Sequence, residues 1–110
     1  MKMKVLAEKV ETILNRGEFS TRPRDFYDIY ILTKTQPFDP TIFAQALKLT
    51  TEHRKSTHIF NQVTQRVYEI KQSEALKLRW NKYKTVNKYA TAISFKDVTD
   101  ALEKLIEYLN

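Results

Sequence analysis

The single glycine among 110 residues, Gly17, is the feature that most limits how this chain can fold. Tight hairpins and phosphate-binding loops use glycine where the backbone needs a positive φ, so one glycine leaves little material for either. Apolar residues recur at helical spacing along most of the chain, and no segment alternates as a strand does. The sequence therefore predicts an all-α fold, a single compact bundle of about five to six helices with no sheet.

Capping and turn signals divide the chain into candidate helices. Ser20 and Thr21 are expected hydroxyl caps before Pro23, and Asp39 is an expected cap before Pro40. Further on, Ser73 and Glu74 mark the expected start of another helix. The expected helices lie at about 3–16, 23–32, 40–53, 59–70, 74–84 and 94–109.

Three more expectations concern how these helices begin and pack. Phe38 and Phe43 are spaced as a hydrophobic staple, and Ser94 with Asp97 is spaced as a capping box. Apolar side chains cover most of the circumference of the segment 23–32. We therefore expect that helix to lie at the centre of the bundle.

The charge balance and the missing residue types narrow the possible partners. Nineteen Lys plus Arg against thirteen Asp plus Glu give a formal charge of +6, which suits a polyanion, although a solvated helical surface also reaches this charge. Without cysteine, neither a disulfide nor a thiolate zinc site can form, and His53 and His58 lack acids at ligand spacing, so no metal site is expected. No apolar stretch is long enough to span a bilayer, so we expect a cytoplasmic protein with no membrane partner.

Lys9, Asp25 and Asp28 are the charged residues that least fit their surroundings. A helical projection puts Lys9 between Val5 and Ile13 on an apolar face, and the two aspartates interrupt the apolar run after Pro23. An ionised group among apolar neighbours costs several kcal/mol unless a cation, a metal or a substrate meets it. The pattern predicts that the lysine and the aspartates meet.

Two interpretations of this trio remain open at this point. In the structural one, Lys9 extends its ammonium group to solvent, Asp25 stabilises a helix start, and Asp28 forms a buried salt bridge with Lys9 or an arginine, the candidates being Arg16, Arg22 and Arg24. In the functional one, a polar pocket lets Lys9 face a phosphate while a carboxylate orients a hydroxyl, a water or a metal-bound ligand.

The segment 74–84 is the most basic candidate helix. Lys77, Arg79, Lys82 and Lys84 flank an apolar stripe that contains Trp80. The lysines and the arginine could contact backbone phosphates, and Trp80, Tyr83 and Tyr89 could stack on bases, but the helical spacing of Trp80 with Leu76 favours a core position for the tryptophan. An alternative function is therefore a stand-alone basic helical module that binds nucleic acid or a protein partner.

Two motifs resemble those of a known family. Ala7-Glu8-Lys9 followed by Ile13-Leu14-Asn15-Arg16-Gly17 resembles the third motif of the AbiEii/AbiGii-type nucleotidyltransferase toxins, which act in bacterial abortive infection, phage defence and toxin-antitoxin systems. Arg22 and the run Arg24-Asp25-Phe26-Tyr27-Asp28-Ile29-Tyr30 resemble its fourth motif. Ser73, Trp80 with Tyr83, and Tyr89-Ala90 resemble the helical tail of such proteins.

This resemblance implies a parent enzyme that transfers nucleotides from a nucleoside triphosphate with magnesium, onto an RNA acceptor, under the control of a cognate antitoxin. It implies that Lys9 contacts the triphosphate, that Asp25 or Asp28 is a polar catalytic contact, and that Arg16, Arg22 and Arg24 bind substrate. The family's Gly-Ser turn and its metal-binding Asp-x-Asp pair have no counterpart here. We therefore expect residues 1–110 to be one helical domain, the C-terminal part of a toxin whose N-terminal nucleotidyltransferase core is missing, binding no cofactor and inactive alone.

Overall fold

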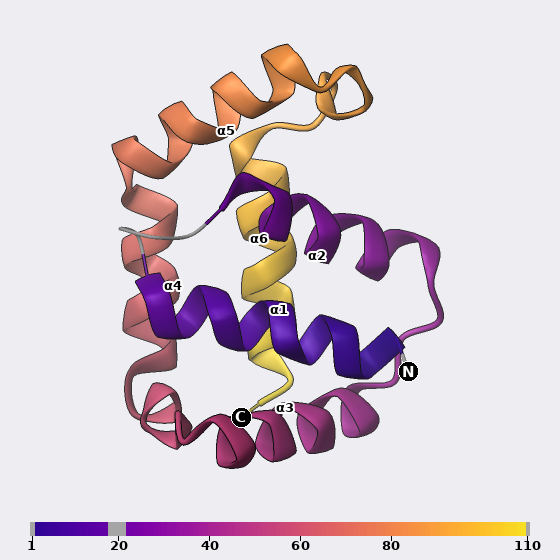
Figure 1. Ribbon diagram of the computed structural model, residues 1–110, viewed down its shortest axis with the longest axis vertical. Helices are drawn as coiled ribbons and strands as arrows, with labels where there is room; N and C mark the ends of the chain where they lie inside the picture. Colours follow the sequence, from indigo (N-terminus) through magenta and orange to yellow (C-terminus); the bar gives the residue numbers. More distant parts are fainter. Residues whose placement is uncertain (1, 18–21, 110) are drawn as a thin grey trace.

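Residues 2–17 and 22–109 are described by the computed structural model, and all regular structure in these ranges is helical. The prediction of an all-α fold is confirmed, with six α-helices in the described part of the chain. In chain order these are α1 (Lys2–Arg16), α2 (Pro23–Thr35), α3 (Pro40–Arg54), α4 (Val63–Gln72), α5 (Glu74–Val86) and α6 (Phe95–Glu107), with short 3-10 helices η2 (Thr57–Gln62) and η3 (Lys88–Ala90). Figure 1 shows α4 and α6 running roughly along the long axis, while α1 and α3 run across that direction.

Two of the helix starts have the caps that the sequence predicts. The carboxylate of Asp39 accepts hydrogen bonds from the backbone N–H groups of Thr41 and Ile42 at 2.9 and 3.2 Å, and Pro40 is the first residue of α3. Before α6, the hydroxyl of Ser94 accepts from the backbone of Asp97, whose carboxylate accepts from the backbone of Ser94 in return. Such reciprocal bonds satisfy backbone donors that a helix start leaves unpaired.

Other boundaries differ from the expectation. The residue before α2 is Arg22, whose side chain makes no capping bond, and the expected hydroxyl caps Ser20 and Thr21 lie outside the described residues. The expected single helix at 59–70 is instead the 3-10 helix η2 followed by α4, which begins at Val63. Lys55 ends α3 in the left-handed conformation, and its backbone N–H bonds back to the last turn of that helix.

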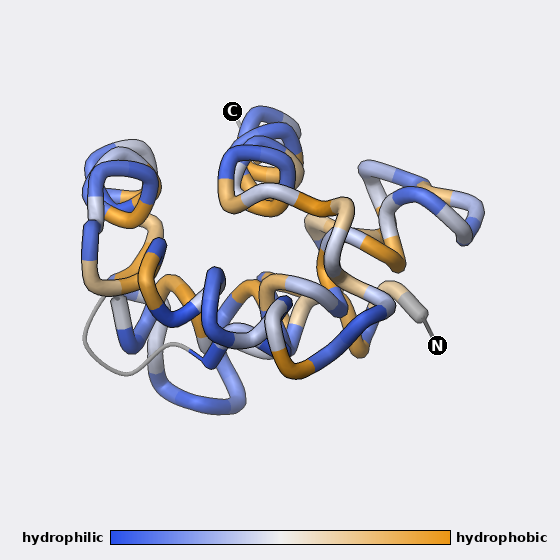
Figure 2. Tube along the Cα trace, turned by 90° about the horizontal axis from the view of Figure 1, so that it is seen from above, coloured by the Kyte–Doolittle hydropathy of each residue, from blue (hydrophilic) through white to orange (hydrophobic). Residues whose placement is uncertain are grey.

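The most buried helix is α1, so the expectation that α2 lies at the centre is wrong. Buried side chains occupy α1 from Met3 to Leu14, and α1 contacts α2, α3, α4 and η2. On α2 only Asp25, Phe26 and Ile29 are buried, since this helix also faces solvent. Figure 2 shows α4 and α6 end-on, with their hydrophobic sides turned toward the rest of the molecule. The core therefore forms around α1.

Gly17 follows α1 with a φ of 68°, a conformation that glycine adopts without steric cost. A Cβ built on this residue would collide with the guanidinium group of Arg66 on α4. The only glycine of the chain thus meets two requirements at once, a helix end in the left-handed region and close approach of a side chain from another helix.

Arg54, the last residue of α3, holds α1 and α3 together through ion pairs. Its guanidinium lies 2.6 Å from a carboxylate oxygen of Glu11, 3.2 Å from the hydroxyl of Thr12 and 3.7 Å from the carboxylate of Glu8. The Glu11 side chain is only 3% exposed, and burying a negative charge costs free energy unless a cation lies close to it. The guanidinium group of Arg54 is that cation.

We expect Arg54→Ala to lower the free energy of unfolding by about 1–3 kcal/mol, because it leaves the buried Glu11 carboxylate without its cation. Urea unfolding followed by circular dichroism measures the change. His53→Ala is the matched control, since His53 is the exposed neighbour of Arg54 on the same helix turn. Glu11→Met in the Arg54→Ala background should restore part of the loss. An Arg54→Ala protein as stable as the control would contradict the ion-pair account.

Candidate functional site

Lys9 on α1 meets both aspartates of α2, as the sequence predicts. Its ammonium nitrogen lies 3.2 Å from an oxygen of Asp25 and 3.0 Å from an oxygen of Asp28. Leu6, Val10 and Ile13 anchor α1 in the core on either side of this lysine, and Phe26 and Ile29 do the same for α2. Apolar packing of the two helices therefore fixes where the three charges meet.

Two arginines complete this group, which we name the Lys9 cluster: Lys9, Arg22, Arg24, Asp25 and Asp28. Arg22 donates from its Nε and Nη2 atoms to the two oxygens of Asp25 at 3.2 and 3.4 Å. Arg24 donates from Nε to Asp28 at 3.3 Å, four residues along the same helix. Three cations against two carboxylates leave the cluster with a formal excess of one positive charge.

Burial within the cluster is uneven. The side chain of Asp25 is 1% exposed, whereas Lys9 is 27% exposed and both arginines are mostly in solvent. Partial burial by itself lowers the pKa of Lys9, but the hydrogen bonds and charges of Asp28 and Asp25 outweigh it and raise that pKa above its ordinary value of 10.5. Lys9 therefore stays positively charged at neutral pH.

The cations of the Lys9 cluster keep donors for a further anion. An ammonium group has three N–H donors and a guanidinium has five, so the contacts with the aspartates leave donors on Lys9, Arg22 and Arg24. Guanidinium groups bind phosphate through paired hydrogen bonds, and charge-assisted bonds of this kind are about twice as strong as neutral ones. The arrangement can thus bind a phosphate at the exposed edge of the α1–α2 interface.

The remaining predicted residues lie elsewhere. Arg16 is exposed at the end of α1 and makes none of the ion pairs of the Lys9 cluster. On α5, Lys77, Arg79 and Lys82 are exposed and Lys84 is half-buried. The side chain of Trp80 is fully buried and its indole N–H donates to the carbonyl oxygen of Ile93 at 2.9 Å, so its predicted core position is confirmed.

Three tyrosines beside the Lys9 cluster form a group that we name the tyrosine platform: Tyr27, Tyr83 and Tyr89. The sequence indicated Tyr83 and Tyr89 as candidates for stacking but did not place Tyr27 with them. The ring of Tyr27 lies 4.8 Å from that of Tyr89 and 6.5 Å from that of Tyr83, measured between centroids. The hydroxyl oxygens of Tyr83 and Tyr89 are 2.5 Å apart and share a hydrogen bond. The one sequence signal for Tyr27 is local, since Tyr27 sits beside Asp28 and three residues after Arg24.

The tyrosine platform and the Lys9 cluster are close enough to influence each other. Burial and the hydrogen bond with Tyr89 raise the pKa of Tyr83 well above its ordinary value of 10, while the nearby charge of Arg24 lowers it and that of Asp28 raises it. The pKa of Arg24 is raised, first by its hydrogen bond to Asp28 and also by the charges of Tyr83 and Tyr89. Both phenol groups of this pair thus lie within electrostatic reach of the cluster.

The described residues do not fit a magnesium site. Magnesium in nucleotidyl transfer needs carboxylate oxygens free to coordinate it. Within residues 2–17 and 22–109, no group of three or more His, Cys, Asp or Glu side chains lies close enough to hold a metal ion. Asp25 and Asp28 are each already paired with two cations.

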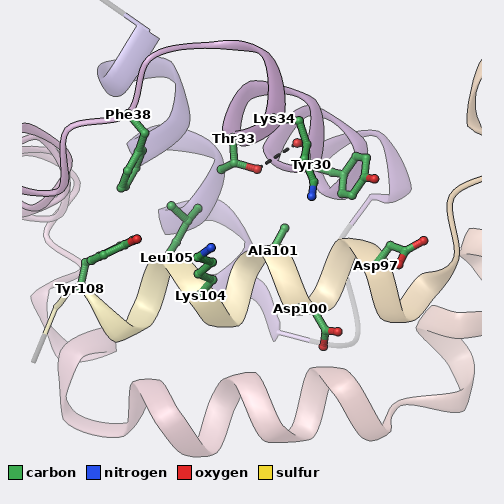
Figure 3. A pocket seen from close by; sticks show the side chains of 10 residues that line it. All are labelled: Tyr30, Thr33, Lys34, Phe38, Asp97, Asp100, Ala101, Lys104, Leu105 and Tyr108. Atoms are coloured by element: carbon green, nitrogen blue, oxygen red, sulfur yellow. Dashed lines mark hydrogen bonds between the residues drawn. The ribbon is translucent and has the colours of Figure 1, made fainter.

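A separate cleft of about 420 Å³ lies between α2 and α6. Figure 3 shows Tyr30, Thr33 and Lys34 of α2 facing Asp97, Ala101 and Lys104 of α6, with Phe38 and Tyr108 at one end. Hydrogen bonds with Ser94 lower the pKa of Asp97, and hydrogen bonds with Lys71 and Lys96 lower that of Asp100, so both acids of the cleft are engaged within the fold. None of the residues of the Lys9 cluster lines this cleft.

Comparison with known proteins supports one family. No curated protein and no solved structure matches the chain. In the described part of the chain, no helix is long and apolar enough to cross a membrane. The family model described as nucleotidyl transferase AbiEii toxin, type IV TA system, matches residues 4–104, which include α1 to α5 nearly in full, the Lys9 cluster and the tyrosine platform. This chain therefore belongs to the AbiEii nucleotidyltransferase toxin family of type IV toxin-antitoxin systems.

Proposed function

We propose that this chain forms one wall of a nucleotidyl-transfer site, in which Lys9 contacts the triphosphate of a nucleoside triphosphate. The observation that carries the proposal is the Lys9 cluster, a set of paired charges with spare donors in a member of a nucleotidyltransferase toxin family. Toxins of this kind have a cognate antitoxin, and nucleotidyl transfer uses a nucleoside triphosphate with a metal ion.

The roles that we propose within the cluster follow from its geometry. Asp25 and Asp28 hold the ammonium group of Lys9 in one position, so little entropy is lost when a phosphate binds. Asp28 is 21% exposed and Asp25 is 1% exposed, which makes Asp28 the aspartate able to touch a substrate hydroxyl. Arg22 and Arg24, with their exposed guanidinium groups, are the proposed further phosphate contacts.

The carboxylates that would hold magnesium in this reaction belong, in our proposal, to a nucleotidyltransferase core outside these 110 residues. The support is chemical, since both aspartates of the site are engaged with cations in the described structure. Residues 1–110 would then act as the C-terminal helical domain of a larger toxin. Arg16, exposed and apart from the cluster, remains a proposed substrate contact only within such an assembly.

We expect no nucleotidyl transfer by this chain alone, because the metal-binding carboxylates are absent from the described site. The test incubates the purified chain with magnesium, RNA and each of the four nucleoside triphosphates labelled in the α-phosphate. Label incorporated into RNA above the level of a boiled sample would refute the proposal that this chain needs a separate metal-binding core for nucleotidyl transfer.

Lys9→Met should weaken binding of inorganic tripolyphosphate by about tenfold or more, since it removes a charge-assisted contact while keeping most of the unbranched side chain. Calorimetric titration of the chain measures the dissociation constant. The unfolding free energy should fall by only about 1 kcal/mol, because Asp25 remains paired with Arg22 and Asp28 remains paired with Arg24.

Lys4→Met is the matched control, because Lys4 lies on the same helix and is exposed outside the cluster. If both substitutions weakened tripolyphosphate binding equally, the effect would come from the net charge of the chain and not from a contact with Lys9. A Lys9→Met protein that unfolds several kcal/mol more easily, together with no tripolyphosphate binding by the unaltered chain, would favour a purely structural cluster.

A second proposal concerns the acceptor: the basic side chains of α5, with Lys77 and Lys84 on one side of the helix and Arg79 and Lys82 on the other, contact the backbone of an RNA. Its support is that three of these four side chains are exposed while the apolar stripe of the helix, with Trp80, is buried. Because Trp80 is in the core, the proposed contact is with phosphates and not by stacking on this ring.

Replacing Lys77 and Lys84 by Gln should reduce the slope of log affinity against log salt for single-stranded RNA by about 1.4, as expected when two phosphate contacts are lost. The two lysines lie seven residues apart, on one side of α5. The control replaces the exposed Lys4 and Lys48 by Gln, which removes the same charge from α1 and α3. Equal slopes for the two double variants would show that Lys77 and Lys84 have no specific role in RNA binding.

A further inference from the structure

The tyrosine platform has the properties of a prepared stacking surface. Tyr89 is 53% exposed, so about half of its side chain is open to a ligand. Its ring is nevertheless held on two sides, by the edge of Tyr27 and by the hydroxyl bond to Tyr83. A ring that is exposed and already ordered can stack on a planar ligand with little loss of entropy.

The support behind the platform is rigid. Tyr83 stacks on Trp80 with 5.4 Å between centroids and 25° between planes, and Trp80 is bonded to the backbone of Ile93. Ala90, next to Tyr89 in η3, is fully buried and anchors that short helix. The platform thus rests on the core of the α5–η3 segment and not on mobile side chains.

The platform adjoins the Lys9 cluster along α2. Arg24 and Tyr27 lie three residues apart on this helix, so their side chains are neighbours on its surface. Figure 1 shows α2 between α1, which carries Lys9, and α5, which carries Tyr83, and α2 contacts both. An aromatic surface therefore continues directly from a group of cations with spare donors.

A nucleotide has this combination of chemistry, with a planar base at one end and phosphates at the other. We propose that the tyrosine platform is the nucleobase-binding wall of the site, with Tyr89 stacking on the base of a nucleotide whose phosphates face Lys9 and Arg24. This inference rests on the proposed function, because the phosphates are what bring the nucleotide to the cluster. Stacking of this kind accepts all four bases, since each has an aromatic face.

The experiment compares ATP with inorganic tripolyphosphate, which has the phosphates without the base. Calorimetric titration of the unaltered chain should give a dissociation constant about tenfold lower for ATP, the gain expected from stacking one base. Tyr89→Ala should bring ATP to the affinity of tripolyphosphate and leave tripolyphosphate unchanged. Tyr89→Phe keeps the ring and should retain most of the preference for ATP.

Tyr68→Ala is the matched control, because Tyr68 is 60% exposed on α4, away from both groups, and its loss should change neither affinity. ATP and tripolyphosphate binding equally well, or Tyr89→Ala binding ATP normally, would overturn the platform while leaving the phosphate site intact. Tripolyphosphate that does not bind, or binds equally well to Lys9→Met, would instead refute the proposed function.

A third outcome separates the nucleotide from the acceptor. If Tyr89→Ala weakens binding of a short single-stranded RNA but not of ATP, the stacked base belongs to the acceptor, and the assignment to the nucleotide is wrong. The fluorescence of Trp80, the single tryptophan, gives an independent reading because its ring stacks on Tyr83. ATP should change this emission in the unaltered chain and tripolyphosphate should not.

Discussion

The burial of Asp25 is the constraint that most narrows how the first two helices can pack against each other. A carboxylate with 1% of its side chain exposed needs cations close by, and Lys9 and Arg22 provide them from α1 and from the residue before α2. If α1 or α2 slid by one residue, this charge would lose a partner. The same contact that makes the packing specific also orients the ammonium group of Lys9, so the fold and the proposed site share one set of charges.

Local sequence patterns were enough to predict most helices and the central contact of the site. The caps at Asp39 and Ser94 involve residues within three positions of each other, and the inward position of Lys9 follows from helical projection. For the tyrosine platform, the sequence indicated Tyr83 and Tyr89 as candidates for stacking, but the contact with Tyr27 could not be predicted, because it requires knowing that the η3 turn returns Tyr89 to the side of Tyr27. The partner of Glu11 was missed for the same reason, since Arg54 is 43 residues away.

The expectation that α2 lies at the centre failed because the apolar pattern of one helix does not show which other helices pack against it. Apolar residues around α2 suggested a central helix, yet Ile31 and Leu32 are only half-buried, and α1 takes that position because four elements pack on it. Arg16 was one of the candidate partners of Asp28. It stands instead about two turns beyond Lys9, at the exposed end of α1, and makes none of the ion pairs with Asp25 and Asp28.

The ion pairs on α1 have a mechanical consequence. Lys9 is tethered to α2, while Glu11, about 200° around the same helix, is tethered to Arg54 of α3. Rotation of α1 about its axis would move both charged groups away from their partners, so the two ion pairs oppose the same motion. The direction in which Lys9 points is therefore set partly by α3, a helix that contributes no residue to the Lys9 cluster.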